Sequence, residues 1–98
     1  MRSTIEEAIK SRRVIRMDYD PGVRLVEPHA LGYSRKGDLL LRAFQTDGAS
    51  ASGESPNWKL FRLDRIRSAT ATNDNFVGPR PEYNPDDSAM KGGVIACL

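Results

Sequence analysis

Hydrophobic residues near the start of the chain recur at the spacing of an amphipathic helix. Ile5, Ala8 and Ile9 fall on one helical face. Residues 3–7 contain two overlapping capping boxes, each a Ser or Thr followed three residues later by Glu. We therefore predict a helix that begins there and ends at about Ser11. A helix this short is not stable alone, so it must pack on the rest of the domain.

After this helix the pattern changes to the two-residue alternation of half-buried β-strands. Asp20-Pro21-Gly22 predicts a turn with proline at its first corner and glycine at its second. Pro28 has no N–H to donate to a strand partner, so its strand lies at an edge, is bulged, or ends there. The expected strands cover residues 14–19, 23–26 resuming at 30–33, 38–45, 58–63 and 66–72.

Two further segments differ from these strands. Residues 46–57 are rich in Gly, Ser, Ala and Pro and predict a flexible loop. From Asn73 onward the composition predicts irregular structure, and Phe76 and Tyr83 could attach this segment to the body. Its apolar end, Val94–Leu98, could add a strand, dock across a dimer, or fray. We expect one domain over residues 1–76 with a C-terminal extension, residues 77–98, that is flexible or docks on the body or on a partner.

The composition narrows the class of protein. The chain has 98 residues, of which 29% are charged and 39% hydrophobic, as in a single globular domain. Its apolar runs are too short to cross a bilayer, and its first residues lack the apolar core of a signal peptide. The single cysteine, Cys97, excludes an internal disulfide and a cysteine-only zinc site. We expect a cytoplasmic protein with no cofactor, no metal and no membrane partner.

Charge is distributed unevenly along the chain. Residues 58–67 carry four Lys/Arg and one Asp/Glu, whereas residues 68–98 carry two and four. The expected body is therefore basic and the tail acidic, which favours a polyanionic ligand on the body. The sequence has no G-x-S-x-G elbow, Walker loop, HExxH or C-x-x-C motif. We therefore expect a protein that is not an enzyme.

The basic stretch at residues 58–66 contains the strongest candidate for a binding site. As a strand it places Trp58 and Arg62 on one face. If the chain then makes a single helical turn through Leu63-Asp64-Arg65, Arg62 and Arg65 return to the same side and form a clamp for a phosphate or carboxylate. The alternative is that these arginines form solvated surface pairs with little effect on stability.

The order of these segments resembles the WYL domain family. The resemblance runs from about Ile5 to Phe76 and is most specific at the ending F-R-L-D-R-I, residues 61–66. The Trp-Tyr-Leu triplet that names the family falls on residues 39–41, where this chain has three leucines. The resemblance implies a mainly β (α+β) fold: a short N-terminal helix and about five strands in an Sm-like, SH3-type small β-barrel.

WYL domains usually follow a DNA-binding helix-turn-helix in bacterial transcription regulators, where they sense a ligand, often a nucleotide or nucleic acid. The 98 residues of this chain leave no room for a helix-turn-helix module beside the resemblance. The resemblance therefore implies a stand-alone, non-enzymatic sensor that binds a nucleotide or single-stranded nucleic acid on a basic face. The candidate ligand-binding residues are Tyr19, Arg24, His29, Arg42, Arg62 and Arg65.

Each of these residues also has a structural interpretation. Tyr19 could stack on a base or pack in the core with its hydroxyl at the rim. His29 could donate to a phosphate or be satisfied locally, and Arg24 and Arg42 could be solvated charges at strand edges. The alternative function is an adaptor that forms a homodimer or docks on a regulator, because the strand 39–44 is apolar on both faces.

Overall fold

The computed structural model describes residues 1–49 and 57–98. In these two ranges, one helix, α1 (Arg2–Ser11), precedes six strands and two single turns of 3₁₀-helix. The strands are β1 (Arg13–Tyr19), β2 (Gly22–Tyr33), β3 (Leu39–Gly48), β4 (Asn57–Arg62), β5 (Ser68–Asn75) and β6 (Gly93–Cys97). The 3₁₀ turns are η1 (Leu63–Arg65) and η2 (Ser88–Met90).

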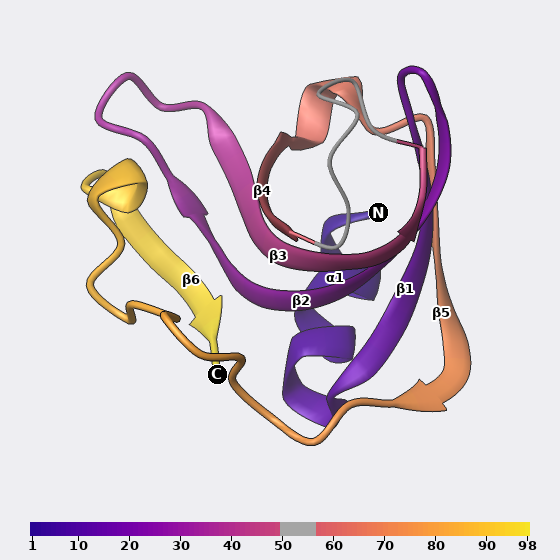
Figure 1. Cartoon of the computed structure of the whole chain (residues 1–98). Helices are drawn as coiled ribbons and strands as arrows, with labels where there is room; N and C mark the ends of the chain where they lie inside the picture. Colours follow the sequence, from indigo (N-terminus) through magenta and orange to yellow (C-terminus); the bar gives the residue numbers. More distant parts are fainter. Residues whose placement is uncertain (50–56) are drawn as a thin grey trace.

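The strands form one antiparallel sheet in the order β4-β3-β2-β1-β5, and β6 also pairs with β2. Figure 1 shows this sheet curled on itself, with α1 beside β1 and β2. The described strands at the two ends, β4 and β5, do not pair with each other. The mainly β, α+β class is confirmed, while the expected barrel is an open, strongly curled sheet.

The main core lies inside the curl. Ile5, Ala8 and Ile9 of α1 pack there against apolar residues of the sheet, including Leu31, Leu41 and Phe61. The helical stripe in the sequence is thus the buried face of α1. The expected capping boxes are wrong, because the N-cap is Met1 rather than Ser3 or Thr4, and it makes no side-chain hydrogen bond.

Strand β2 is the centre of the sheet. Its first half pairs with β1 and its second half with β6, while β3 pairs along most of its length. The register shifts between Pro28 and Ala30, so Pro28 lies at a bulge, which lets a residue without an N–H stay within the strand. The turn before β2 differs from the prediction, since Asp20 and Pro21 occupy its corners and their peptide bond is cis.

The structure also decides the ambiguous segments. Strand β3 extends to Gly48, and residues 50–56, where we expected most of a flexible loop, lie outside the described residues. The single turn predicted at residues 63–65 is confirmed as η1. Of the three possibilities for the apolar terminus, the structure has the added strand, β6.

The segment between β5 and β6, residues 76–92, crosses the outer face of the sheet, and we call it the strap. Figure 1 shows it running outside the curl before the chain returns as β6. Met90 of the strap packs on Ala30 and Leu40 in a second small core, together with Tyr83 and Ala89. The two apolar faces of β3 are therefore both covered within the chain.

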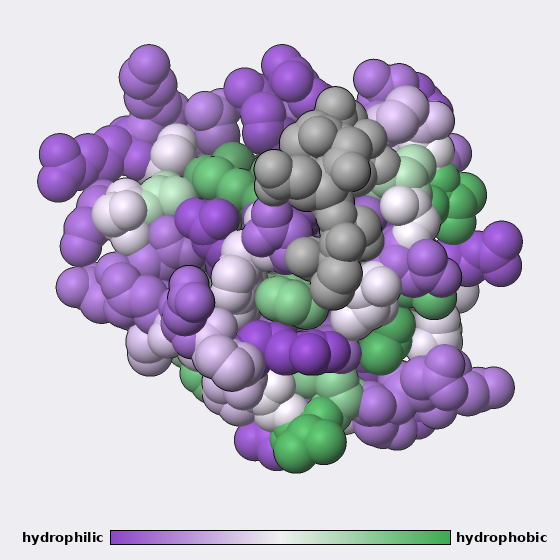
Figure 2. Space-filling model, viewed as in Figure 1, coloured by the Kyte–Doolittle hydropathy of each residue, from purple (hydrophilic) through white to green (hydrophobic). Residues whose placement is uncertain are grey.

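No helix among the described residues is long and apolar enough to cross a membrane. The side of the molecule seen in Figure 2 is largely hydrophilic, with small, separate hydrophobic patches. The large hydrophobic side chains that are exposed come from different elements: Met1, Val23, Leu60, Val77 and Val94. The described surface thus has scattered apolar residues, which are normal for a monomer.

Candidate functional site under the strap

The outer face of β3 and β4 carries two arginines and the only tryptophan. Arg42 pairs with Leu60, and Arg62 pairs with Leu40 on the neighbouring strand. Paired residues and residues two apart share a face of a sheet, so Arg42, Arg62 and Trp58 lie on the same side. The opposite side of these strands carries Leu41, Ala43 and Phe61 of the main core.

Arg42 is held by a carboxylate of the strap. Its Nε donates to Asp87 Oδ2 at 2.8 Å and its Nη2 donates to Asp87 Oδ1 at 3.2 Å. Asp87 also caps η2, because its Oδ1 accepts the Ala89 N–H at 2.9 Å. These hydrogen bonds, chiefly those from Arg42, lower the pKa of the Asp87 carboxyl, so that it remains ionised beside the guanidinium.

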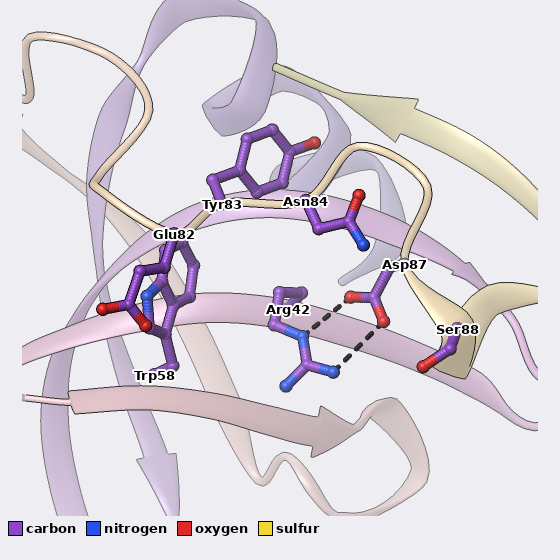
Figure 3. Close-up of a pocket in the computed structure, with 7 residues that line it drawn as sticks. All are labelled: Arg42, Trp58, Glu82, Tyr83, Asn84, Asp87 and Ser88. Atoms are coloured by element: carbon purple, nitrogen blue, oxygen red, sulfur yellow. Dashed lines mark hydrogen bonds and ion pairs between the residues drawn. The ribbon is translucent and has the colours of Figure 1, made fainter.

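A cavity of about 220 Å³ lies beside this ion pair. Figure 3 shows the guanidinium of Arg42 facing the Asp87 carboxylate, with Trp58 and Glu82 on the other side of Arg42. The indole N–H of Trp58 donates to the Pro81 carbonyl at 3.2 Å and so attaches the ring to the strap. The cavity is lined by Arg42, Trp58, Glu82, Tyr83, Asn84, Asp87 and Ser88.

His29 is the second attachment of the strap to the sheet, and its side chain is fully buried. Its Nε2 accepts the backbone N–H of Arg80 at 3.1 Å, so the ring proton lies on Nδ1, which donates to the Glu27 carbonyl at 2.8 Å. The ring stacks on Phe76 at 5.7 Å and contacts Trp58 and Tyr83. Burial lowers the pKa of His29, which favours the neutral ring that this network needs.

Arg80 makes the third attachment. Its Nε and Nη2 donate to the two carboxylate oxygens of Glu27 at 2.8 and 3.0 Å. The guanidinium also lies over the Phe44 ring, 4.5 Å from its centroid. The outer face of the sheet and the strap are thus joined by two bidentate ion pairs of opposite polarity. In one the sheet supplies the cation, and in the other it supplies the anion.

Arg24 does not reach the outer face. Its side chain is only 3% exposed, and it donates to the carbonyls of Tyr19 and Asp20 and to Gln45 Oε1. These bonds use the guanidinium to fasten the β1–β2 turn. Tyr19 belongs to the same cluster: its ring contacts Phe61 edge-on at 4.9 Å, and its hydroxyl accepts the Arg62 N–H at 3.4 Å.

Arg62 is bound by the carboxylate of the turn that follows it. Arg62 donates to Asp64 at 2.8 and 3.1 Å and to Asp38 at 3.2 Å. The hydrogen bond from Arg62 is the main cause of the lowered pKa of Asp64, and the charge of exposed Arg65 contributes less. Of the two cations of the expected clamp, Arg62 therefore already holds an anion, Asp64, of its own chain.

The four arginines do not share one basic face, which corrects the expectation from the sequence. Arg42 lies under the strap, Arg24 fastens a turn, and Arg62 is paired with Asp64 and Asp38. Sequence reasoning missed Glu27, Arg80 and Asp87, because it treated the tail as irregular. The signals that could have found them are the aromatic residues Phe76 and Tyr83, which were noted as possible attachments and do pack on His29.

No group of three or more His, Cys, Asp or Glu residues in the described ranges could hold a metal ion.

Comparison with known families and proteins yields a match to a family model. No curated protein and no solved structure matches the chain. The sequence model of the WYL domain matches residues 2–71, which end within β5 and precede the strap. The chain therefore belongs to the WYL domain family, a family of ligand-sensing, regulatory domains.

Proposed function

We propose that this domain is a non-enzymatic sensor that binds a nucleotide or a single-stranded nucleic acid on the outer face of β3 and β4. The observation that carries the proposal is the register that places Arg42, Arg62 and Trp58 on one face. Arginine binds phosphate oxygens in a bidentate geometry, and an indole provides a surface on which any base can stack. Membership of the WYL family supports the sensing role.

The spacing of these residues suits a phosphate chain rather than a single ion. Arg42 and Arg62 are diagonal neighbours on paired strands, which places their Cβ atoms roughly 7–8 Å apart. Beyond Arg62, the exposed side chains of Arg35 and Lys36 occupy the turn between β2 and β3, and Asp38 of the same connection contacts Arg62. A strand that stacks on Trp58 can thus continue toward this basic turn.

The test is a titration of the purified domain with fluorescently labelled oligo-dT and oligo-rU at two salt concentrations. Phosphate contacts predict that log K falls by about 0.7 for each contact per log unit of salt. We expect the double variant Arg62→Ala/Arg65→Ala to bind more weakly and with a shallower salt slope. The matched control is Lys10→Ala/Arg16→Ala, which removes the same charge from exposed positions on α1 and β1. Equal binding by the wild type and the Arg62/Arg65 variant would contradict this site.

The adaptor alternative has less support in the structure. The apolar face of β3 and the apolar terminus, which suggested a dimer or a docked regulator, are covered by the strap and by pairing of β6 with β2. We therefore rest the proposal on ligand binding.

A further inference from the structure

We propose that the strap is a built-in competitor of the ligand, in which the Asp87 carboxylate occupies the position on Arg42 that an anionic group of the ligand takes. This inference rests on the proposed function and concerns the regulation of the same face. Ligand binding would then displace the strap, and the displaced strap would be the signal that the sensor passes on.

The first argument is the geometry of the ion pair. Asp87 meets Arg42 with two nearly parallel hydrogen bonds of 2.8 and 3.2 Å. A phosphate uses the same two guanidinium N–H groups with the same fork geometry. An anionic ligand therefore has to replace Asp87 to bind this arginine through its Nε and Nη2.

The second argument is burial. The Asp87 side chain is 8% exposed, whereas the Asp64 carboxylate on Arg62 is 63% exposed. Asp64 can thus leave Arg62 for solvent while the strap stays in place, whereas Asp87 can leave the Nε and Nη2 of Arg42 only when the strap moves. The two arginines of the proposed site differ in this respect, so only binding at Arg42 is coupled to the strap.

The third argument is size. The cavity beside Arg42 has about 220 Å³, which is less than the roughly 300–1,000 Å³ of sites that enclose a small ligand. A nucleotide that stacks on Trp58 and reaches Arg42 requires more room. The strap also attaches to Trp58 through the Pro81 carbonyl, so opening the strap frees both the ring and the guanidinium.

The fourth argument is that the strap lies outside the part of the chain that defines the family. The WYL match ends at residue 71, and the strap begins at residue 76. The strands that it covers therefore lie within the matched residues, whereas the strap itself lies outside them. A segment that neutralises a basic residue of the binding face is suited to regulating access to it.

The test compares Asp87→Asn with Asp86→Asn. Asn at position 87 can still accept the Ala89 N–H and cap η2, but it loses the charge that holds Arg42. Asp86 is the adjacent exposed acid and pairs with Lys91, so its substitution removes the same charge without touching Arg42. The probes are AMP and labelled oligo-dT at one fixed salt concentration.

If the strap competes, the apparent affinity rises with the fraction of molecules whose strap is open. We expect Asp87→Asn to bind roughly tenfold more tightly, because a charged hydrogen-bonded pair no longer holds the strap. Asp86→Asn should stay within about twofold of the wild type. If the wild type binds and Asp87→Asn binds no more tightly, the inference that the strap competes is overturned and the proposed function still stands. Absence of binding by every form would overturn both.

Hydrogen exchange on the wild-type protein gives a second measurement that needs no variant. With AMP or oligo-dT bound, the N–H groups of Arg80 and Ala89, which are bonded to His29 and Asp87, should exchange faster. The exchange of the N–H groups of β1, and of residues 22–26 of β2 that pair with β1, should not change. Slower exchange in the strap would overturn the inference, because it would show that the strap closes over the ligand.

Discussion

The role of each arginine in this domain is decided by its nearest acceptors. Arg24 and Arg16 are both cations of the β1–β2 hairpin, and neither is distinguished by its sequence context. Arg24 is buried and donates to two carbonyls and to Gln45, while Arg16 on β1 is exposed. Removing a buried donor leaves its acceptors without partners, whereas removing a solvated charge leaves water in its place.

We expect Arg24→Ala to lower the free energy of unfolding by about 2–4 kcal/mol. Arg16→Ala, the matched control on the same hairpin, should change it by less than about 0.5 kcal/mol. Urea denaturation followed by circular dichroism measures both. Similar small losses for the two variants would show that Arg24 does not fasten the turn and would make it a ligand-binding candidate again.

At the scale of elements, the two glycines next to and at the end of β3, Gly37 and Gly48, meet different requirements. Gly48 ends β3 with φ +100°, and a Cβ there would collide with the Val23 carbonyl and lie 2.6 Å from the Arg24 Cα. Gly37, in the turn before β3, has φ +91° with no atom near a Cβ. Both require left-handed backbone, but only Gly48 also requires empty space.

Gly37→Ala should therefore cost about 1–2 kcal/mol of stability, from the backbone alone. Gly48→Ala should cost roughly 1–3 kcal/mol more, because the β2 backbone must move away from the new methyl group. Thermal or urea unfolding of the two variants gives the difference. Equal losses would mean that the ends of β2 and β3 can separate without cost.

The sequence predicted these elements well where the signal was local. The α1 stripe, the β strands and the η1 turn each depend on spacings of a few residues, and each lies close to its expected position. The N-cap of α1 and the corners of the β1–β2 turn were misplaced, because several neighbouring residues had suitable chemistry and the sequence does not rank them.

At the scale of the whole molecule, His29 joins the sheet to the strap. Its neutral ring accepts the Arg80 N–H, and the charged groups that face it are Glu27 and Arg80. Protonation would place an N–H against the Arg80 N–H. The lowered pKa means that the unfolded chain binds this proton more readily than the folded chain. The stability that the neutral His29 contributes is therefore present above pH 6.5 and is lost as the pH falls below 6.5.

We expect the free energy of unfolding to fall between pH 7 and pH 5, and His29→Gln to show a flatter profile over this range. Asp64 and Asp87 also have lowered pKa values, but their contributions are lost only as the pH falls below 3.8. Trp58 contacts His29 and Tyr83 and reports on the strap by fluorescence during urea titration. The same pH slope in wild type and His29→Gln would exclude His29 as its source.

The candidate site was less predictable than the fold. Arg42, Arg62 and Trp58 could be found from charge and alternation, and the register of β3 with β4 places them on one face. Their partners could not be found in this way, because Asp87 lies 45 residues after Arg42 and Arg80 lies 53 residues after Glu27. Such pairs depend on the path of the strap across the sheet.

The sequence by itself determined the helix and the first five strands, their order and the two faces of each strand, since these follow from steric and hydrophobic preferences acting over a few residues. Only the tertiary structure decided which cations are available, because an arginine keeps or loses its free N–H groups according to which distant carboxylate the folded chain brings to it. In this domain Arg24 is buried and fastens a turn, Arg42 is held by the strap, and Arg62 remains accessible.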